Sequence, residues 1–589
     1  MMLTPRGYLF FCAHTTKKVP SLVYYNDRLF LSSISNDPGR ETRFVQGCSF
    51  PMPMNNVAMP TARLLPPLPV GNSSFERLRE DKQLYVDKTD LIYQLASRSE
   101  KFFLTRPRRF GKSLLVSTFA SLFSHGLRYF SGLAIEKLWH DKIYHVVRID
   151  FSEIKDFKTA AEFACQFYDK LQWWFRPAGF RYDATLPGDV ITQLSAWIKT
   201  LPVSSLVILI DEYDAPLTDS LNDRTLFDDV RSKLTLFYAV IKANDDCVRF
   251  MFITGIAKFN QTGIFSALNN FSDISLYKNF GTLLGYSEAD LDRWFEGYEE
   301  KAAQALSLSR EEVRNRLRAN YDGYCFDGQA STRVYNPWSV LRFFSWPDEG
   351  FSNYWMTSGG KPNILQKYLL SHSLQSPADY AATKELPYSA LDASSDFDTI
   401  DDVALLTQAG YLTIKRRRGR YFQVGYPNQE VADALAELYS DLLLQERSYD
   451  DVGAGDLVDA VHAGNVEQFF ESANRAFAAI DYTRYPVTNE KSCQAFLQIF
   501  VLGAGFDVTA ENHSALGHSD LEIKTAEHHW VVELKYLPQG QGTADALLAD
   551  AIEQMKNRRY GTSAKVPLLR VAAVFSSETC AFVAWKAIE

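Results

Sequence analysis

The chain has 589 residues, which is too long for a single hydrophobic core and predicts about two to four domains. Its formal net charge of -9 excludes a general basic coat of the histone type, although it allows a local basic groove. The 7 scattered cysteines form no CxxC pair and no apolar run reaches the ~18 residues of a membrane helix, so we expect a cytoplasmic protein without a disulfide framework.

Residues 1–70 are predicted to be a disordered leader. They are rich in Pro, Met and Asn, as in MPMNNVAMP and LLPPLPVG, and they show no sustained helix or strand period. Met59 stands just before the first organised segment and is an alternative start of translation.

Residues 71–285 are expected to form a parallel α/β domain. Two short helices around a YVDKT turn precede an apolar run at 101–105, the RPRRFGKS segment and a further helix. Strand-like runs follow at 145–151, 206–210 and 249–254, with helical patterns between them. Strands that alternate with helices predict βαβ units and an open sheet covered on both faces.

Residues 286–450 are predicted to be largely helical, with a winged-helix-like end. A helix and two strands joined by an Arg/Gly turn are expected around 400–432. The cations at 415–418, together with Arg420, lie in this hairpin and leave two interpretations open. They contact a nucleic-acid backbone, or they form an ordinary solvated turn.

Residues 451–589 are predicted to form a second α/β domain of the restriction-endonuclease-like kind. The expected elements, in chain order, are a helix at 489–503, strands at 506–512, 519–525 and 529–536, a helix at 543–560 and a strand at 568–576. The fold class is therefore α/β, with two α/β domains on either side of the helical and winged-helix-like region.

The first candidate site is a phosphate-binding loop. Gly111, Lys112 and Ser113 follow a strand and begin a helix, which is the context in which a GK[ST] triplet binds phosphate. Lys112 is expected to reach the β- and γ-phosphates, and the Ser113 hydroxyl is expected to hold Mg²⁺. The first glycine of the pattern GxxxxGK[ST] falls on Arg106 here, so the loop must turn without that glycine.

Acidic residues at the end of another strand complete this site. Asp211 suits the water shell of Mg²⁺, and Glu212 suits polarisation of an attacking water. Thr254 ends the next strand and is either a γ-phosphate sensor or an ordinary strand-end hydroxyl. The two arginines at 108 and 109 either contact phosphate or are simply exposed. The predicted nucleotide-binding residues are Arg108, Arg109, Phe110, Gly111, Lys112, Ser113, Leu114, Asp211 and Thr254.

Six segments together resemble one family. FERLREDKQLYVDKT, TRPRRFGKS, LIDEYD, FITGIAKF, YDGYCF and YNPWS are similar to segments of the AAA-ATPase-like family, over about residues 65–345. RPRRFGKS is the usual P-loop of that family, so the resemblance implies that Arg106 is a family trait. It also implies a P-loop ATPase of the additional-strand type that binds ATP and Mg²⁺. The YVDKT turn then becomes a candidate for the adenine or phosphate pocket, unless it serves helix packing and capping.

The second candidate site combines carboxylates with a lysine. Glu533 and Lys535 are two residues apart on one strand and therefore share a face, and Asp520 is expected at the start of the preceding strand. Two carboxylates on adjacent strands make an oxygen-rich Mg²⁺ site, and the lysine can position or deprotonate an attacking water. Glu490 on the preceding helix is a third carboxylate, and Gln554 on the following helix is expected to orient substrate or water.

The order of these residues resembles the PD-(D/E)XK nuclease superfamily, over about residues 455–589. Relatives often carry an arginine near the motif aspartate, whereas this chain has His518 and Ser519, which puts the phosphate contacts in doubt but leaves the acidic set complete. The predicted metal ligands of the two sites are Ser113, Asp211, Asp520 and Glu533.

Two functions remain open at this level. The first is a Mg²⁺-dependent nuclease under ATP control, and the resemblance favours DNA over RNA as its substrate. The second is an ATP-dependent regulatory switch whose C-terminal domain binds nucleic acid or protein without cutting. A purely structural protein is disfavoured by two polar constellations at strand ends. A homo-oligomer is an open alternative, because such ATPases often complete their sites with a neighbour's arginine.

Overall fold

The structure is a computed structural model. It describes residues 65–256, 258, 271–357, 365, 383–392, 400–443, 453–480, 482, 485–506, 508–514, 517–558 and 566–588, and the backbone of 21–25 and 28–32. Two compact units divide the chain, Met1–Leu64 and Leu65–Glu589. Within the first, β1 (Ser21–Tyr25) and β2 (Arg28–Ser32) form an antiparallel hairpin inside the segment predicted to be disordered. The other residues up to 64, Met59 included, lie outside the described residues.

The last residues of the predicted leader differ from the expectation of disorder. Leu65 and Leu68 pack against an apolar cluster that includes Leu84 and Tyr298. The Pro67 carbonyl accepts a hydrogen bond from the Leu84 amide at 2.9 Å. Composition alone does not reveal this order, because the segment is stabilised by side chains that are distant in sequence.

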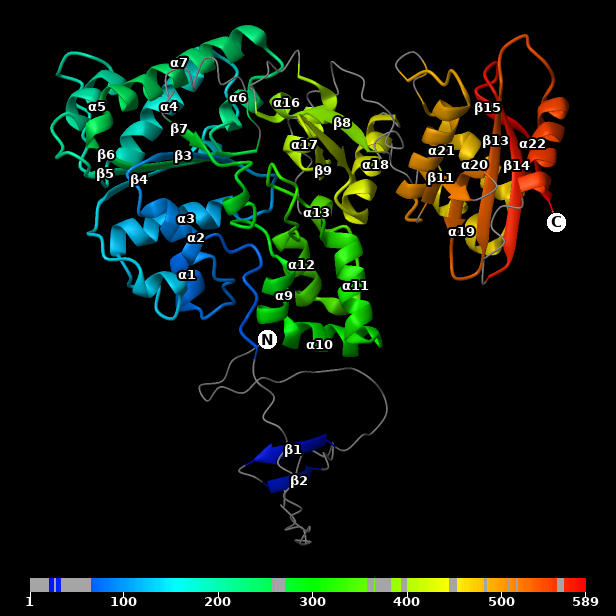
Figure 1. Cartoon of the computed structure of the whole chain (residues 1–589), viewed down its shortest axis with the longest axis horizontal. Coiled ribbons are helices and arrows are strands. Elements are labelled where there is room, and N and C mark those ends of the chain that lie inside the picture. Colours follow the sequence, from blue (N-terminus) through cyan, green and yellow to red (C-terminus); the bar gives the residue numbers. More distant parts are fainter. Residues whose placement is uncertain are drawn as a thin grey trace, which may run out of the picture. The chain divides into compact units, whose positions relative to one another are not determined.

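The elements of the P-loop region alternate as the sequence predicts (Figure 1). Its strands are β3 (Lys101–Thr105), β4 (His145–Asp150), β5 (Leu206–Asp211), β6 (Val248–Gly255) and β7 (Phe271–Asp273). Its described helices are α1 (Phe75–Glu80), α2 (Thr89–Ala96), α3 (Lys112–His125), α4 (Ala160–Phe175), α5 (Val190–Ile198), α6 (Ala215–Asp219) and α7 (Arg224–Ala243), with short 3-10 turns η1 (Ala134–Lys137), η2 (Phe151–Glu153), η3 (Asp245–Cys247) and η4 (Lys278–Phe280).

The five strands form one parallel sheet in the order β4-β5-β6-β3-β7. Strand β6 lies between β3, which leads into the P-loop, and β5, which ends in Asp211, so the predicted additional-strand arrangement is confirmed. All residues of β3, β5 and β6 are buried, as expected for a sheet covered on both faces. Figure 1 shows α1–α3 on one face and α4–α7 on the other. The register pairs Thr105 with Gly255 and Asp150 with Asp211, which aligns the carboxyl ends at one edge.

The middle region begins with helices, continues into a small sheet and ends in a helix. Its described elements are α9 (Glu288–Trp294), α10 (Glu296–Leu306), α11 (Arg310–Tyr321), α12 (Pro337–Ser345), η5 (Pro347–Glu349), α13 (Tyr354–Thr357), β8 (Lys384–Pro387), α16 (Tyr388–Asp392), α17 (Asp402–Ala409), β9 (Thr413–Arg418), β10 (Tyr421–Gly425) and α18 (Gln429–Leu443). Helix α17 followed by the β9–β10 hairpin agrees with the expected helix and two strands. Strand β8 pairs with β10 and was not predicted.

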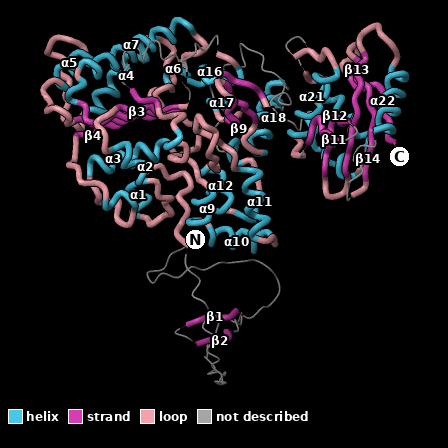
Figure 2. The backbone as a smooth tube through the Cα atoms, in the orientation of Figure 1, coloured by secondary structure: helices cyan, strands magenta, loops and turns pink. Residues whose placement is uncertain are grey.

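The C-terminal region is a mixed sheet between two helical layers (Figure 2). Its elements are α19 (Ala454–Ala463), α20 (Val466–Phe477), α21 (Glu490–Gly503), β11 (Val508–Ser514), β12 (Gly517–Lys524), β13 (His529–Leu537), α22 (Ala544–Arg558), β14 (Leu568–Ser576) and β15 (Ala581–Ile588). The strand order is β11-β12-β13-β14-β15, and only the β13–β14 pair is parallel. Trp530 and Val532 face one apolar cluster with α19–α21, whereas Val531 faces a second cluster with α22.

No helix among the described residues is long and apolar enough to cross a membrane.

Candidate nucleotide and phosphodiester sites

The P-loop lies at the carboxyl edge of the parallel sheet. Gly111 adopts φ 87°, a left-handed conformation that suits glycine, and helix α3 begins at the next residue. Lys112 is buried, and its Nζ donates to the carbonyls of Arg106 and Pro107 at 3.0 Å each. The Ser113 hydroxyl donates to the carboxylate of Asp211. The pair predicted to hold Mg²⁺ is therefore in contact, although the two residues are far apart in sequence.

Burial and charge set the proton affinities in this site. Burial raises the pKa of Asp211 and of Glu212, while Lys112 opposes both shifts. Burial lowers the pKa of Lys112, and the carboxylates of Asp211, Glu212 and Asp214 oppose that shift. Asp214 was not predicted from sequence, and its carboxylate accepts a hydrogen bond from the Ile256 amide at 2.9 Å. The concentration of acidic groups around one lysine fits a divalent cation that accompanies a phosphate chain.

Arg106 explains how the loop turns without its first glycine. Its side chain is 1% exposed and donates to the carbonyls of Thr105 at 2.8 Å, Ser275 at 2.9 Å and Phe280 at 3.1 Å. Its guanidinium carbon also lies 4.4 Å from the centre of the Phe326 ring. Arg106 therefore fastens the P-loop to the segment after β7 and does not face a phosphate position.

The other loop residues contact the middle region. Arg109 has φ 70° and lies over the Trp338 ring, with its guanidinium carbon 4.3 Å from the ring centre. The buried Phe110 ring meets Tyr324 and Phe326 edge-on, with centroids 4.8 and 5.0 Å apart. The YDGYCF and YNPWS motifs thus cover the P-loop. Arg109 is half-buried and packs on an aromatic ring, so it is not simply exposed, and a phosphate contact stays a prediction.

Arg108 is half-buried, and its charge lowers the pKa of Lys112 along with burial. Its guanidinium is thus near the ammonium group that the sequence assigns to phosphate binding. A phosphate chain would neutralise two cations that otherwise repel each other.

An apolar pocket of about 570 Å³ adjoins the loop. Gly111 and Leu114 line it from the P-loop side, Tyr85 and Lys88 line it from the YVDKT turn, and Tyr286 closes it from the middle region. Burial raises the pKa of Tyr85, although Thr118 hydrogen-bonds to the phenol and opposes the shift. Lys88 pairs with Asp290 at 2.5 Å, so the turn contributes a structural ion pair as well as pocket lining.

Thr254 is fully buried, and its hydroxyl donates to the Leu104 carbonyl at 2.8 Å. This bond joins β6 to β3 and favours the second of the two interpretations offered for Thr254, that of an ordinary strand-end hydroxyl.

The carboxylate–lysine constellation is assembled across β12 and β13. Asp520 lies inside β12 and not at its start, and its carboxylate accepts a hydrogen bond from the Leu534 amide of β13 at 2.7 Å. Glu533 is 1% exposed, and its Oε1 lies 3.5 Å from the ammonium of Lys535. The side chains predicted to share a face therefore do so.

Residues from two helices complete this cluster. Glu490, at the first turn of α21, lies 3.7 Å from the Lys535 ammonium. Gln554 of α22 donates its amide to Glu533. Burial raises the pKa of Glu490, which Lys535 opposes and Asp520 reinforces. The sequence missed Gln494, whose side-chain amide donates to the backbone carbonyl of the metal-site aspartate.

Asp520 and Glu533 are the carboxylates of this cluster from which a divalent cation would take its oxygen ligands. No group of three or more His, Cys, Asp or Glu side chains in the described part of the chain is placed closely enough to hold a metal. In the cluster itself, Lys535 and Gln554 contact the carboxylates that a metal would use. Asp520 and Glu533 nevertheless offer the hard oxygen donors that Mg²⁺ prefers, and they lie on adjacent strands. The donor chemistry of these two residues therefore fits Mg²⁺.

The GYPNQEV segment at residues 425–431 supports the YNPWS motif that covers the P-loop. Glu430 is buried and accepts hydrogen bonds from the Ser339 hydroxyl at 2.8 and 2.9 Å and from the Trp355 amide at 2.9 Å. Asn428 donates to the Asp322 carbonyl at 2.6 Å. The sequence gives no sign of this role beyond one carboxylate beside two amide side chains.

The fold and the two sites define a P-loop ATPase-like domain followed by a PD-(D/E)XK nuclease-like domain. Residues 69–265 match a family model described as "Predicted AAA-ATPase", and residues 488–585 match one described as "PD-(D/E)XK nuclease superfamily". The chain is also 31% identical over 512 residues to an "Uncharacterized protein in vnfD 5'region" of Azotobacter chroococcum mcd 1. This alignment covers 84% of the chain and 92% of that protein, so the chain belongs to the same family.

Proposed function

We propose that the chain hydrolyses phosphodiester bonds of nucleic acid in its C-terminal domain, and that ATP bound at the P-loop controls this reaction. The observation that carries the proposal is the convergence of Asp520, Glu533 and Lys535 on adjacent strands, with Glu490 at 3.7 Å from the same ammonium. Bound Mg²⁺ would supply charge neutralisation at the phosphate and a more acidic water.

The residues of the chain have separate tasks in this reaction. Lys535 can hold the attacking water, because its ammonium already lies beside two carboxylates. It can accept the proton of that water only after it has lost its own proton and become a neutral amine. Glu490 is suited to proton transfer nearer neutral pH than an ordinary glutamate, because burial raises its pKa. Gln554 can orient the carboxylate of Glu533.

The nucleotide is proposed to lie along the carboxyl edge of the parallel sheet. Lys112 and Ser113 would contact the phosphates and Mg²⁺, and Glu212 would polarise the attacking water. The apolar pocket beside Gly111 suits a base, because Tyr85 and Tyr286 offer aromatic surface next to the phosphate end.

A reducing, cytoplasmic location agrees with the free cysteines among the described residues.

A cleavage assay tests the nuclease assignment. The parent is incubated with linear duplex, circular and single-stranded DNA and with RNA, in Mg²⁺ or Mn²⁺, with and without ATP. Metal-dependent cleavage is expected, and Glu533→Gln should abolish it. Glu553→Gln changes an exposed glutamate beside Gln554 in the same helix and should cut like the parent. Cleavage by Glu533→Gln at the parental rate would contradict the assignment.

ATP binding is tested separately. Lys112→Ala should lose ATP affinity and ATP hydrolysis, whereas Lys158→Ala, which removes an exposed lysine, should lose neither. ATP binding by Lys112→Ala with unchanged affinity would place the nucleotide elsewhere.

A regulatory switch is the second candidate, and one set of contacts favours it. The segment that packs on Phe110 also holds the root of the β9–β10 hairpin, because the Cys325 amide donates to the Thr413 hydroxyl at 2.8 Å. Arg333 donates to the Lys415 carbonyl at 2.6 Å in the same hairpin. A change at the P-loop can therefore reach the hairpin through packed groups. ATP hydrolysis without cleavage of any substrate would favour this candidate over the nuclease.

A further inference from the structure

The β9–β10 hairpin concentrates positive charge in a chain whose net charge is -9. Arg416, Arg417, Arg418 and Arg420 are all exposed, and Lys415 at the base is half-buried. The strand register pairs Tyr421 with Arg418 and Phe422 with Arg417. Side chains alternate across a strand, so cations project from both faces of the hairpin and from its turn.

Carboxylates neutralise these cations weakly in the described part of the chain. Arg418 forms an ion pair with Glu385 at 3.7 Å, and the two side chains are 74% and 56% exposed. Such an exposed pair contributes little and exchanges easily with a phosphate. Arg417 is held by carbonyls instead, since it donates to Gly328 at 3.0 Å and to Gly419 at 3.2 Å. These hydrogen bonds fix the position of the Arg417 guanidinium but do not neutralise its positive charge.

A groove of about 620 Å³ adjoins the Arg417 face of the hairpin. Lys278, Asn279 and Gln329 contribute polar groups to its lining, Tyr277 and Tyr388 contribute aromatic surface, and no lining residue is acidic. The Arg417 guanidinium carbon lies 5.7 Å from the centre of the Tyr388 ring.

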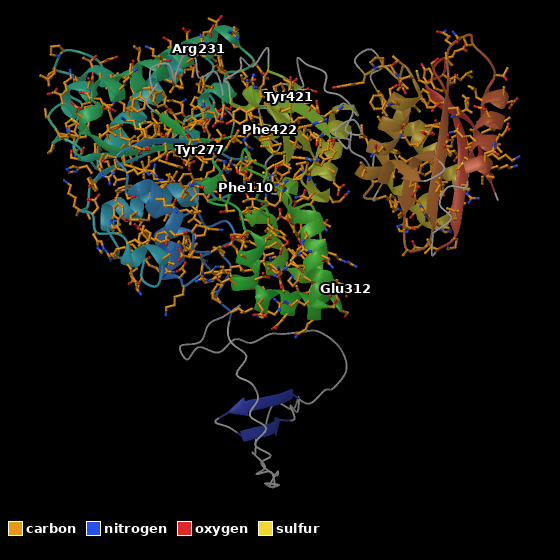
Figure 3. All side chains as sticks on the ribbon, viewed as in Figure 1. Phe110, Arg231, Tyr277, Glu312, Tyr421 and Phe422 are labelled. Atoms are coloured by element: carbon orange, nitrogen blue, oxygen red, sulfur yellow. The ribbon has the colours of Figure 1, made fainter. Side chains whose placement is uncertain are left out.

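Two tyrosines near these cations are unusually exposed. Tyr277, at the edge of the groove, is 55% exposed, and Tyr421, opposite Arg418, is 49% exposed. Both are labelled in Figure 3. Large aromatic side chains in water beside arginines are typical of surfaces that stack bases while cations contact the backbone. Ordinary solvated turns rarely combine the two.

We propose that the hairpin and its groove bind a single strand of nucleic acid. On one face of the hairpin its phosphates contact Arg416 and Arg418 and a base stacks on Tyr421. The strand then crosses the turn at Arg420, and a second base stacks on Tyr277 in the groove on the Arg417 face. The site would lie outside the nuclease cluster and would hold the polymer that this cluster acts on. The inference rests on the proposed function for the choice of a nucleic acid, but it does not require that the strand is cut.

The test measures binding of labelled 30-nucleotide oligomers to the full chain by fluorescence anisotropy, with EDTA present to prevent cleavage. The probes are single-stranded DNA, single-stranded RNA and duplex DNA. The test variant is Arg416→Gln/Arg418→Gln/Arg420→Gln. The matched control, Lys155→Gln/Lys158→Gln/Lys199→Gln, removes the same charge from other exposed positions. Circular dichroism and thermal unfolding establish that each variant is folded.

The expected result follows from counterion release. Each phosphate contact on a single strand adds about 0.7 to the slope of log affinity against log salt, so three lost contacts reduce that slope by about 2. At ~0.1 M salt the affinity should then fall on the order of 100-fold, while the control stays within about threefold of the parent. Tyr277→Ala and Tyr421→Thr should each weaken single-strand binding with no change in the salt slope.

Several outcomes would overturn the inference. Parental affinity and salt slope in the arginine variant would exclude the hairpin as the binding surface. Tighter binding of the duplex than of either single strand would exclude a stacked single strand. The proposed nuclease is judged separately, because Glu533→Gln should lose cleavage and keep binding. The arginine variant should need a higher substrate concentration for half-maximal cleavage, in line with its weaker binding.

Discussion

Replacing Arg106 with glycine would restore the standard P-loop pattern, and we predict that it damages the protein. Its three hydrogen bonds to carbonyls tie the loop to Ser275 and Phe280. Hydrogen bonds of a charged group contribute about 1.5–3 kcal/mol each, and the cost of burying the cation offsets part of that sum. The Phe280 carbonyl keeps a second donor, the Leu283 amide at 3.2 Å.

The Arg106→Gly change should therefore lower the free energy of unfolding by about 3–5 kcal/mol, since it also leaves a void beneath the Phe326 ring. ATP affinity should fall as well, because Lys112 is positioned by the carbonyls of Arg106 and Pro107. Arg106→Lys should be intermediate, because a single ammonium cannot replace a planar group that bonds to three carbonyls and stacks on a ring.

Urea denaturation and ATP titration of the parent, Arg106→Gly and Arg106→Lys would measure both effects. Arg108→Gly is the control for the urea denaturation only, because this neighbouring arginine is half-buried and should cost less stability. An Arg106→Gly protein that is as stable as the parent and binds ATP at least as tightly would refute the reasoning. Arg106 would then contribute neither to the stability of the protein nor to its affinity for ATP.

Three further predictions concern other sites. Burial raises the pKa of Glu430 from 4.5 to about 8 in the folded protein. The protonated carboxyl group therefore adds its full contribution to the free energy of unfolding below pH 4.5, and this contribution is lost as the pH rises to about 8. Glu430→Gln should flatten this fall in the free energy of unfolding between pH 5 and pH 8, and equal slopes in parent and variant would contradict the shift. Gly323→Ala should lower the free energy of unfolding by at least about 1–3 kcal/mol, because φ is +97° and a Cβ would lie 2.2 Å from the Pro427 carbonyl oxygen. Gly419→Ala is the control and should cost less, because its Cβ would meet no atom within 4 Å. Chemical denaturation measures both. Lys535→Met should reduce the cleavage rate by about 10²-fold or more while nucleic-acid binding persists, and a rate within threefold of the parent would exclude the lysine from catalysis.

The sequence was most informative where neighbouring residues determine the outcome. Buried strands were recognisable from continuous apolar runs such as LVILID and RFMFIT, and every residue of those strands is buried. The face shared by Glu533 and Lys535 follows from the two-residue period of a strand. The association of Asp211 with Ser113 could also be predicted, because parallel strands end at one edge of a sheet and a P-loop begins there.

The roles of several buried polar residues depend on contacts between segments that are distant in the sequence. The role of Arg106 depends on carbonyls about 170 positions further along the chain, and the role of Glu430 depends on a hydroxyl 91 positions before it. The covering of Phe110 by YDGYCF and the contact of Gln554 with Glu533 are of the same kind.

The sequence by itself therefore determined the α/β class, the central strands of the two larger sheets, the two motifs and the faces on which their side chains lie, because local periodicity and adjacency govern these features. The tertiary structure alone decided which buried polar group pairs with which, how the P-loop turns without its glycine and where exposed cations meet exposed tyrosines. Those pairings depend on how whole elements pack, and no local pattern of residues encodes that packing.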